Sequence, residues 1–355
     1  MSSPFDRAPR SVCILRLSAI GDTCHVLPVV RTLQRAWPNT SFTWIIGRVE
    51  AKLLGHIPDI EFVVVDKSST LAAYRTLRAA MQGRHFDVLM HMQVALRASL
   101  LSTLVPARIK LGFDRRRARE LQWLFTTNRL RPADRQHVMD AMFGFAEKFH
   151  VYDKLFRWDI PIPEAARAYA RKAIPDGEKM LIISPCSSHP LRNWRSEYYA
   201  QIADYAIGAL GLNVMLCGGR SEYERRFGEA IESRMKQRCF NMIGKDTLLE
   251  FLATLERATL LLTPDSGPAH MATAVGTPVI GLYAATNPAR SGPYLSRQWC
   301  IDKYDVAARR LLGKPAAELP WTTKIEQPGV MDLITPEEVI KKLHAVLLAL
   351  SRKKH

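Results

Sequence analysis

Short apolar runs alternate along this chain with longer segments of helical periodicity, and the alternation occurs twice. In the first half we expect strands at 12–17, 42–46, 62–65 and 87–92, and helices at 23–37, 71–81, 98–104 and 137–149. In the second half we expect strands at 180–184, 213–217, 259–263 and 278–283, and helices at 197–210, 221–236, 247–256 and 267–274. This alternation is typical of parallel sheets with helices on both faces.

The segment 161–177 separates the two halves and holds three prolines and Gly177, with a charged helical stretch between them, so we interpret it as a linker. The chain of 355 residues is long enough for two domains with separate cores. We therefore predict an α/β protein with two Rossmann-like, doubly wound domains, 1–160 and 178–334. A final helix within 335–355 starts at Thr335-Pro336, where threonine suits the N-cap and proline the first turn.

The charge is strongly positive, with 50 Lys and Arg against 34 Asp and Glu, a formal net charge of +16. The window 97–135 contributes +7 of this excess and includes Arg115, Arg116 and Arg117. Such a balance favours a polyanionic partner, although a basic run can also be a solvated surface. Because the sequence has no zinc-finger spacing, basic-region heptads or aromatic RNA-binding strand, we do not expect nucleic acid as the partner.

Other classes of protein are excluded by what the sequence lacks. No apolar run reaches the length of a membrane span, and the first 22 residues do not resemble a signal peptide. The six cysteines are scattered without a C-x-x-C pair, which favours reduced thiols in a cytoplasm. No histidine or cysteine spacing indicates a metal site. We expect a cytoplasmic protein without structural metal.

In doubly wound sheets, ligands bind beyond the carboxyl ends of the strands, so the loops after strands are the candidate sites. The first such loop, 18–22, lacks G-x-G-x-x-G and ends on Asp22. A carboxylate at this junction can cap the following helix, or it can act as a general base, and the two roles are compatible.

The loop 184–188 follows the first strand of the second half and precedes Arg192. Its hydroxyls and amides together with one guanidinium are suited to phosphate, although a serine-rich loop is not specific by itself. The third loop is 263–270, in which Gly267 permits close approach of a ligand and Pro268 suits the first turn of a helix. The amides at that helix start can bind a diphosphate, Asp265 can accept from ligand hydroxyls, and His270 is either a ligand contact or an ordinary helix residue.

Taken together, S-A-I-G-D at 18–22, Ser187-Ser188 with Arg192, and D-S-G-P-A-H at 265–270 followed by G-T-P at 276–278 resemble glycosyltransferase family 9. These are the ADP-heptose:lipopolysaccharide heptosyltransferases of Gram-negative bacteria. The stretch 281–294 also resembles a motif of the family, and the resemblance covers roughly residues 11–351.

The resemblance implies a GT-B fold, in which an N-terminal acceptor domain and a C-terminal nucleotide-sugar domain face a cleft and the last helix crosses back to the first domain. It implies transfer with inversion from an ADP-sugar to the inner core of lipopolysaccharide, with no tightly bound cofactor and no required divalent cation. It further implies a monomer that associates peripherally with the anionic inner membrane surface. The choice of heptose as the donor sugar depends on the resemblance alone.

The family's residues transfer to this sequence as follows. Asp22 is the expected catalytic base, and arginine at 192 replaces a lysine that is frequent in relatives, which preserves charge and changes geometry. Glu222, in preference to Glu224, is the expected ribose ligand. The expected donor-binding residues are Ser187, Ser188, Arg192, Glu222, Asp265, Ser266, Gly267 and His270, and the expected acceptor-binding residues are Arg16, Arg115, Arg116 and Arg117.

Two other functions are compatible with the residues alone. One is a nucleotide- or nucleic-acid-binding Rossmann protein without catalysis, which would explain the positive charge. The other is a GT-B-like sugar-nucleotide epimerase, which would release a free sugar without an acceptor. A general base and a phosphate-binding loop in the same chain favour the transferase.

Overall fold

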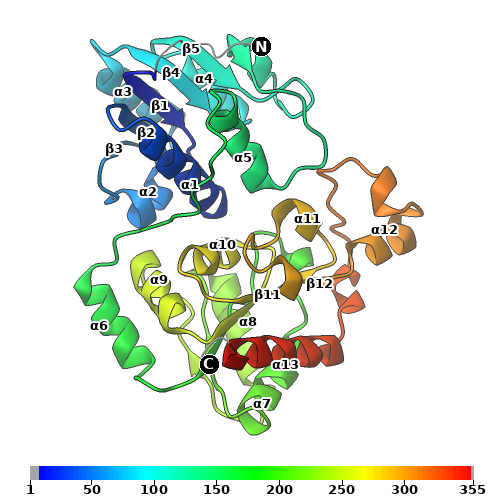
Figure 1. The fold of residues 1–355 in the computed structure, drawn as a ribbon. Coiled ribbons are helices and arrows are strands. Elements are labelled where there is room, and N and C mark those ends of the chain that lie inside the picture. The colour runs from blue at the N-terminus through cyan, green and yellow to red at the C-terminus, as the bar shows by residue number, and fades with distance from the viewer. Residues whose placement is uncertain (1–7, 353–355) are drawn as a thin grey trace. The chain divides into compact units, whose positions relative to one another are not determined.

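The computed structural model describes residues 8–352 (Figure 1). The chain divides into two compact units, Met1–Pro161 and Ile162–His355. Each unit contains one six-stranded sheet in which every strand pair is parallel, with flanking helices. This arrangement confirms the α/β class and the two Rossmann-like units of the predicted GT-B fold.

The first sheet has the strand order β3-β2-β1-β4-β5-β6. Its strands are β1 (Ser11–Leu15), β2 (Ser41–Gly47), β3 (Glu61–Val65), β4 (Phe86–His91), β5 (Ala107–Gly112) and β6 (Asn128–Arg129). Because the order reverses between β1 and β4, the loops that follow these two strands lie at the switch point, where doubly wound sheets bind ligands. The sequence predicts the four strands β1 to β4 and misses β5, in which charged and apolar residues alternate.

The helices of the first unit are α1 (Ile20–Ala36), α2 (Arg48–Leu54), α3 (Thr70–Met81), α4 (Leu96–Ser102) and α5 (Val138–Glu147), with a 3₁₀ helix η1 (Gln122–Leu124). The sequence predicts all of these except α2 and η1. Helix α1 starts three residues earlier than expected, so Asp22 is its third residue rather than the residue before it. The apolar faces of α3 and α4 pack on β1 and β4 in one core cluster.

The second sheet has the order β12-β11-β10-β7-β8-β9. Its strands are β7 (Met180–Ile183), β8 (Asn213–Leu216), β9 (Phe240–Asn241), β10 (Leu260–Pro264), β11 (Val279–Tyr283) and β12 (Ile301–Asp302). Its helices are α6 (Glu164–Ala173), α7 (Ser196–Gly208), α8 (Glu222–Glu232), α9 (Leu248–Arg257), α10 (Gly267–Ala274), α11 (Pro288–Ser291), α12 (Tyr304–Leu312) and α13 (Pro336–Arg352). The predicted strands correspond to β7, β8, β10 and β11 and the predicted helices to α7, α8, α9, α10 and α13, with α10 at the predicted bounds, whereas α12 was not predicted.

The predicted linker begins at the boundary between the units, since the first ends at Pro161 and the second starts at Ile162. The charged helical stretch expected within it is α6, whose Ala166 and Ala170 pack against Ala253 of α9. Pro163 is the N-cap of this helix and Pro175 follows its end, so the two prolines delimit it. The segment 285–330 holds α11, α12 and β12.

Helix α13 begins as predicted. Thr335 Oγ1 accepts from Glu338 N at 3.4 Å, and Glu338 Oε2 accepts from Thr335 N at 3.1 Å. The buried residues Val339, Leu343 and Val346 belong to the core of the second unit, and the helix contacts α7, β11 and β12. Its apolar face is therefore used within its own unit, and the expected packing on the first domain stays a prediction. Among the helices of residues 8–352, none has the length and apolar character needed to cross a bilayer.

Candidate active site

Asp22 lies in the first turn of α1, directly after the central strand β1. Its Oδ2 atom accepts a hydrogen bond from the backbone N–H of Ala19 at 3.4 Å and forms an ion pair with the guanidinium of Arg16. The Asp22 side chain is 35% exposed, whereas that of Arg16 is 10% exposed. The carboxylate therefore contacts the start of its helix and still reaches solvent, so both roles expected for it are compatible with its position.

Arg16 is held from several directions. Its Nη1 donates to Met92 O at 2.5 Å, and its own carbonyl accepts from Trp44 Nε1 at 3.1 Å. The next residue is also fixed, because Leu17 N donates to Gln93 Oε1 at 2.6 Å. These contacts let Arg16 position Asp22, while acceptor binding by Arg16 stays a prediction.

The three consecutive arginines differ from one another. Arg115 and Arg116 are exposed. Arg117 is partly buried and pairs with the buried Asp114; it also donates to Gln136 Oε1 at 2.7 Å and to Arg131 O at 2.8 Å. These bonds connect the loop after β5 to the segment after β6 and give Arg117 a structural role, while its expected acceptor contact stays a prediction. Acceptor binding by Arg115 and Arg116 stays a prediction.

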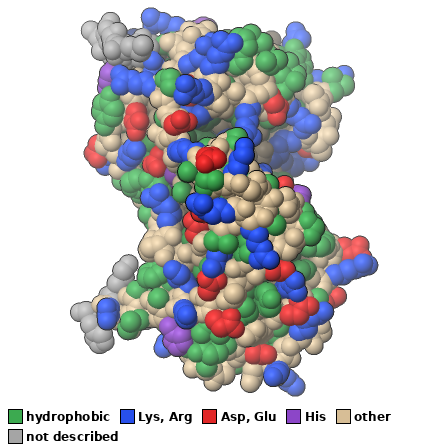
Figure 2. Space-filling model, turned by 90° about the vertical axis from the view of Figure 1, so that its right-hand side faces the viewer, with side chains coloured by type: hydrophobic (Ala, Val, Ile, Leu, Met, Phe, Trp, Pro, Cys, Tyr) green, Lys and Arg blue, Asp and Glu red, His purple; other side chains and the backbone are tan. Residues whose placement is uncertain are grey.

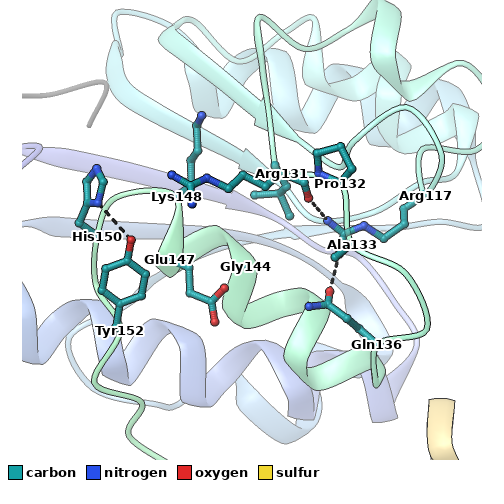
Figure 3. A pocket seen from close by; sticks show the side chains of 11 residues that line it. Arg117, Arg131, Pro132, Ala133, Gln136, Gly144, Glu147, Lys148, His150 and Tyr152 are labelled. Carbon is teal, nitrogen blue, oxygen red and sulfur yellow. Dashed lines mark hydrogen bonds between the residues drawn. The ribbon is translucent and has the colours of Figure 1, made fainter. Parts of the chain in front are cut away.

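A small pocket of about 110 Å³ lies beside Arg117 (Figure 3). Figure 3 shows the bonds from Arg117 to Gln136 and to the Arg131 carbonyl, and the contact between His150 and Tyr152 across from them. The pocket is lined by Arg117, Leu130, Arg131, Pro132, Ala133, Gln136, Gly144, Glu147, Lys148, His150 and Tyr152. Small-ligand sites have volumes of about 300–1,000 Å³, so this pocket is too small for a nucleotide sugar.

In the second unit, the loop after β7 carries the serines and the arginine predicted for the donor. Ser187 N donates to Asn193 Oδ1 at 2.7 Å, and Ser187 Oγ donates to His189 O at 2.9 Å. These bonds set the shape of the loop, and Ser188 at its tip is exposed. Arg192 Nε and Nη2 donate to Glu326 Oε1 at 2.7 and 2.5 Å.

The loop after β10 lies next to it, because β10 and β7 are paired neighbours. Thr263 Oγ1 donates to Ser184 O at 2.8 Å and lies 2.8 Å from Ser266 Oγ, which joins the two loops. Ser266 is the N-cap of α10, so the amides at Gly267 and beyond start a helix, a place favourable for an anion. The structure thus brings the starts of the predicted loops 184–188 and 263–270 together, and it buries His270 within α10.

Asp265 lies at the end of β10 and accepts from Ser291 Oγ at 3.2 Å. Lys324 lies within electrostatic range of Arg192, Arg290 and Asp265. Burial lowers the pKa of the Lys324 ammonium, and the charges of Arg192 and Arg290 lower it further, while Glu326 and Asp265 act in the opposite direction. Cations this close together repel one another, so an anion placed among them would relieve the repulsion.

Lys324 and Glu326 are residues of this cluster that the sequence analysis missed, whereas Arg290 lies in the stretch 281–294 that resembles a family motif. Lys324 and Glu326 belong to a segment that lacks periodicity, and only the folded chain brings them to Arg192, more than 130 positions earlier. Burial raises the pKa of the Glu326 carboxyl, but the hydrogen bonds and charge of Arg192 outweigh this effect and leave the pKa below its usual value. No signal in the local sequence pointed to Lys324 or Glu326.

Of the two glutamates considered for the ribose, Glu222 lies at the start of α8, is exposed and pairs with Arg226 at 2.5 Å. Glu224 instead accepts from Gly219 N at 2.5 Å and from Ser221 Oγ at 3.1 Å. Glu224 therefore stabilises the glycine loop, whereas Glu222 has the exposure that a ligand contact needs. The Glu222 assignment stays a prediction.

The sequence profile of glycosyltransferase family 9 (heptosyltransferase) matches residues 74–321. The lipopolysaccharide core heptosyltransferase OpsX of Haemophilus influenzae is 40% identical over 339 residues, which are 96% of this chain and 97% of that protein. Lipopolysaccharide heptosyltransferase 1 of Pseudomonas aeruginosa is 24% identical over 95% of this chain and 98% of its own length.

Solved structures show the same fold. A family 9 glycosyl transferase of Veillonella parvula superposes with a TM-score of 0.78 at 24% identity, covering 96% of this chain and 97% of that one. The structure of the Escherichia coli heptosyltransferase WaaC with ADP superposes with a TM-score of 0.72 at 19% identity, covering 95% of this chain and 99% of that one. From the profile match and the identity to a curated relative, this chain belongs to glycosyltransferase family 9, the heptosyltransferases.

Proposed function

We propose that this enzyme transfers a heptose from ADP-heptose to the inner core of lipopolysaccharide, with inversion at the anomeric carbon. The observation that carries the proposal is the pair of sites at the carboxyl ends of the two sheets. The first sheet holds a solvent-reaching carboxylate fixed by a buried arginine, and the second holds a cation cluster beside a helix start. A base and a diphosphate site are the two parts that inverting transfer requires.

On the acceptor side, Asp22 removes the proton from the attacking hydroxyl. General-base catalysis requires a carboxylate within reach of that proton and held in one orientation. The ion pair with Arg16 and the Ala19 amide supply the orientation. The oxygen attacks the anomeric carbon from the face opposite the diphosphate, which gives inversion.

On the donor side, negative charge develops on ADP as the glycosidic bond breaks. Arg192 and Lys324 are fixed cations that can take up this charge, together with the amides at the start of α10. Stabilisation of transition-state charge by groups that are already in place is the largest contribution to the rate enhancement of many enzymes. These side chains supply the positive charge that a divalent cation would otherwise provide. We therefore propose that the enzyme needs no divalent cation.

We also propose that the enzyme works as a monomer in the cytoplasm, at the anionic surface of the inner membrane. The support is the net charge of +16 and the membrane-anchored nature of the proposed acceptor. Anionic membranes attract basic surfaces over a distance that salt shortens.

The test is an assay with purified enzyme, ADP-heptose and a deacylated inner-core acceptor, in which mass spectrometry follows the product. We expect a mass gain of one heptose that depends on the acceptor and persists with a chelator present. Release of free sugar without acceptor would instead indicate an epimerase or a hydrolase. Failure of the acceptor to react with any of a panel of ADP- and UDP-sugars would contradict transferase activity.

A further inference from the structure

Two segments of the first unit expose leucines. Leu96 and Leu100, one turn apart on α4, are 42% and 51% exposed; Leu121 and Leu124, around η1, are 53% and 59% exposed. Glu120 Oε2 accepts from Leu96 N at 2.6 Å, so the start of α4 adjoins the start of η1. We refer to Leu96, Leu100, Leu121 and Leu124 as the leucine patch.

The position of the patch is fixed by Gln122, which is fully buried. Its Nε2 donates to His91 O at 2.8 Å and to Gln93 O at 3.0 Å, and its Oε1 accepts from Phe113 N at 3.3 Å. The residues on either side of this anchor point away from the core. Leu121 has a φ of 61°, a left-handed conformation that leucine rarely adopts, and its side chain nevertheless stays in solvent.

Exposed arginines lie on or near the segments that carry the patch. The Arg115 guanidinium lies over the Trp123 ring at 4.8 Å from its centre, and that of Arg129 lies at 6.0 Å. Both cations are therefore kept beside an aromatic ring between Leu121 and Leu124. We refer to the exposed arginines of these segments as the arginine rim: Arg97, Arg115, Arg116, Arg119 and Arg129. Figure 2 shows one face of the molecule, where Lys and Arg side chains lie among hydrophobic ones.

We propose that the leucine patch inserts into the interface of an anionic lipid bilayer while the arginine rim binds the lipid phosphates. Apolar side chains beside a tryptophan and basic residues form the surface that peripheral membrane proteins use. Charge complementarity selects a bilayer with anionic headgroups, because Arg115 and Arg129 lie at the ring of Trp123, between Leu121 and Leu124 in sequence, and the other rim arginines add positive charge. The inference rests on the proposed function in one respect, namely that the acceptor is a lipid.

The same short segment connects the patch to Asp22. Gln93 O accepts from Gln122, and Gln93 Oε1 accepts from Leu17 N, next to Arg16. Met92 O accepts from Arg16 Nη1, and Arg16 pairs with Asp22. The leucine patch and the proposed base are thus both connected by hydrogen bonds to residues 91–93, at one end of the first sheet. Docking through the patch would place Asp22 near the headgroup of a glycolipid whose chains remain in the bilayer.

The experiment measures flotation of the protein with vesicles of phosphatidylcholine alone and with phosphatidylglycerol added, at low salt. We expect the wild type to float only with the anionic vesicles. The double variant Leu121→Ser, Leu124→Ser should lose about tenfold in partitioning, although its net charge is unchanged. Leu348→Ser, which removes a leucine of 54% exposure on α13, is the matched control and should float like the wild type.

A second readout is quenching by brominated phosphatidylglycerol, which should fall in Trp123→Phe relative to the wild type if Trp123 contacts lipid. Equal flotation of the wild type and the double variant would overturn the inference. Failure of the wild type to float with anionic vesicles would also overturn it. A wild-type dimer that the double variant no longer forms would show that the patch binds a second copy instead. Transfer to the deacylated acceptor tests the proposed function separately, since that reaction needs no bilayer.

Discussion

Asp22 and Arg16 form an ion pair in which the arginine is the buried partner and the carboxylate is the one that reaches solvent. Arg16 is fixed by the carbonyl of Met92 on the strand-end segment next to β1. The neighbouring strand thus determines where the carboxylate points. An acidic side chain in the first turn of a helix commonly serves that helix alone; here it is also held by a cation from the sheet.

Replacing Asp22 by Asn should remove transfer while leaving ADP affinity within a few-fold of the wild type. Loss of a general base typically lowers the rate by about 10²–10⁴. The donor cluster belongs to the other unit and keeps its own contacts. Turnover with the deacylated acceptor and calorimetry with ADP give the two quantities. A variant that retains nearly normal turnover would reduce Asp22 to a helix-capping residue.

Arg192→Ala should weaken binding of both ADP and the intact donor, and it should also slow turnover. The guanidinium is positioned by Glu326 and would contact the diphosphate before and during bond cleavage, so both quantities depend on it. Arg195→Ala is the matched control, because Arg195 pairs with Asp332 outside the cation cluster. Unchanged ADP affinity in Arg192→Ala would show that the phosphate role is assigned incorrectly.

Binding of ADP should depend on pH through Lys324. Burial and the charges of Arg192 and Arg290 lower the pKa of this ammonium in the free protein, and a bound diphosphate would raise it. The protonated form therefore binds ADP better, and affinity should fall as the pH rises from neutral toward 10.5, the ordinary value for lysine. Lys324→Gln should bind ADP more weakly at neutral pH and show a flatter profile. Parallel profiles for the two proteins would argue against contact with phosphate.

Substitutions in the arginine triplet should have two different effects, one on acceptor binding and one on stability. Arg115→Ser with Arg116→Ser should raise KM for the lipid acceptor by about tenfold at low salt, and the effect should shrink as salt rises. Arg117→Ser should instead lower the free energy of unfolding by about 2–4 kcal/mol, because Asp114 would remain buried without its cation. Urea unfolding and acceptor kinetics measure these effects. A stable Arg117→Ser protein with raised KM would support the acceptor role.

Acid should destabilise the first unit through His91. Burial, together with the charges of Lys110 and Arg16, lowers its pKa to about 3 from 6.5. Between these values the unfolded chain binds a proton that the folded protein does not. The contribution of His91 to the free energy of unfolding is therefore fully present above about pH 6.5. It falls on acidification by up to about 1.4 kcal/mol per pH unit.

In His91→Gln this contribution is absent, so its unfolding free energy should vary less steeply with pH in that window. Chemical unfolding of both proteins over a pH series measures the difference in slope. Equal slopes would mean that His91 is protonated in the folded state, despite its contacts with Ser99 and Gln122.

The sequence by itself determined the sheet architecture and the loops that carry the chemistry. Apolar runs and helical periodicity are local properties, and in a parallel sheet the loop after each strand necessarily lies at the carboxyl edge. This is why Asp22, Ser187, Arg192 and Asp265 could be proposed as site residues without coordinates. The prolines at 163 and 175 delimit α6, where the sequence predicts a charged helical stretch, because proline suits the start of a helix and cannot continue one past its end.

Only the tertiary structure decided which side chains meet. It committed Arg16 to Asp22 and Arg117 to Asp114, and it brought Lys324 and Glu326 to Arg192 from an aperiodic segment. The three adjacent arginines cannot be distinguished in the sequence, yet Arg117 is held by hydrogen bonds whereas Arg115 and Arg116 are exposed to solvent. The physical reason is that burial and ion pairing depend on residues distant along the chain, whereas periodicity depends on neighbours.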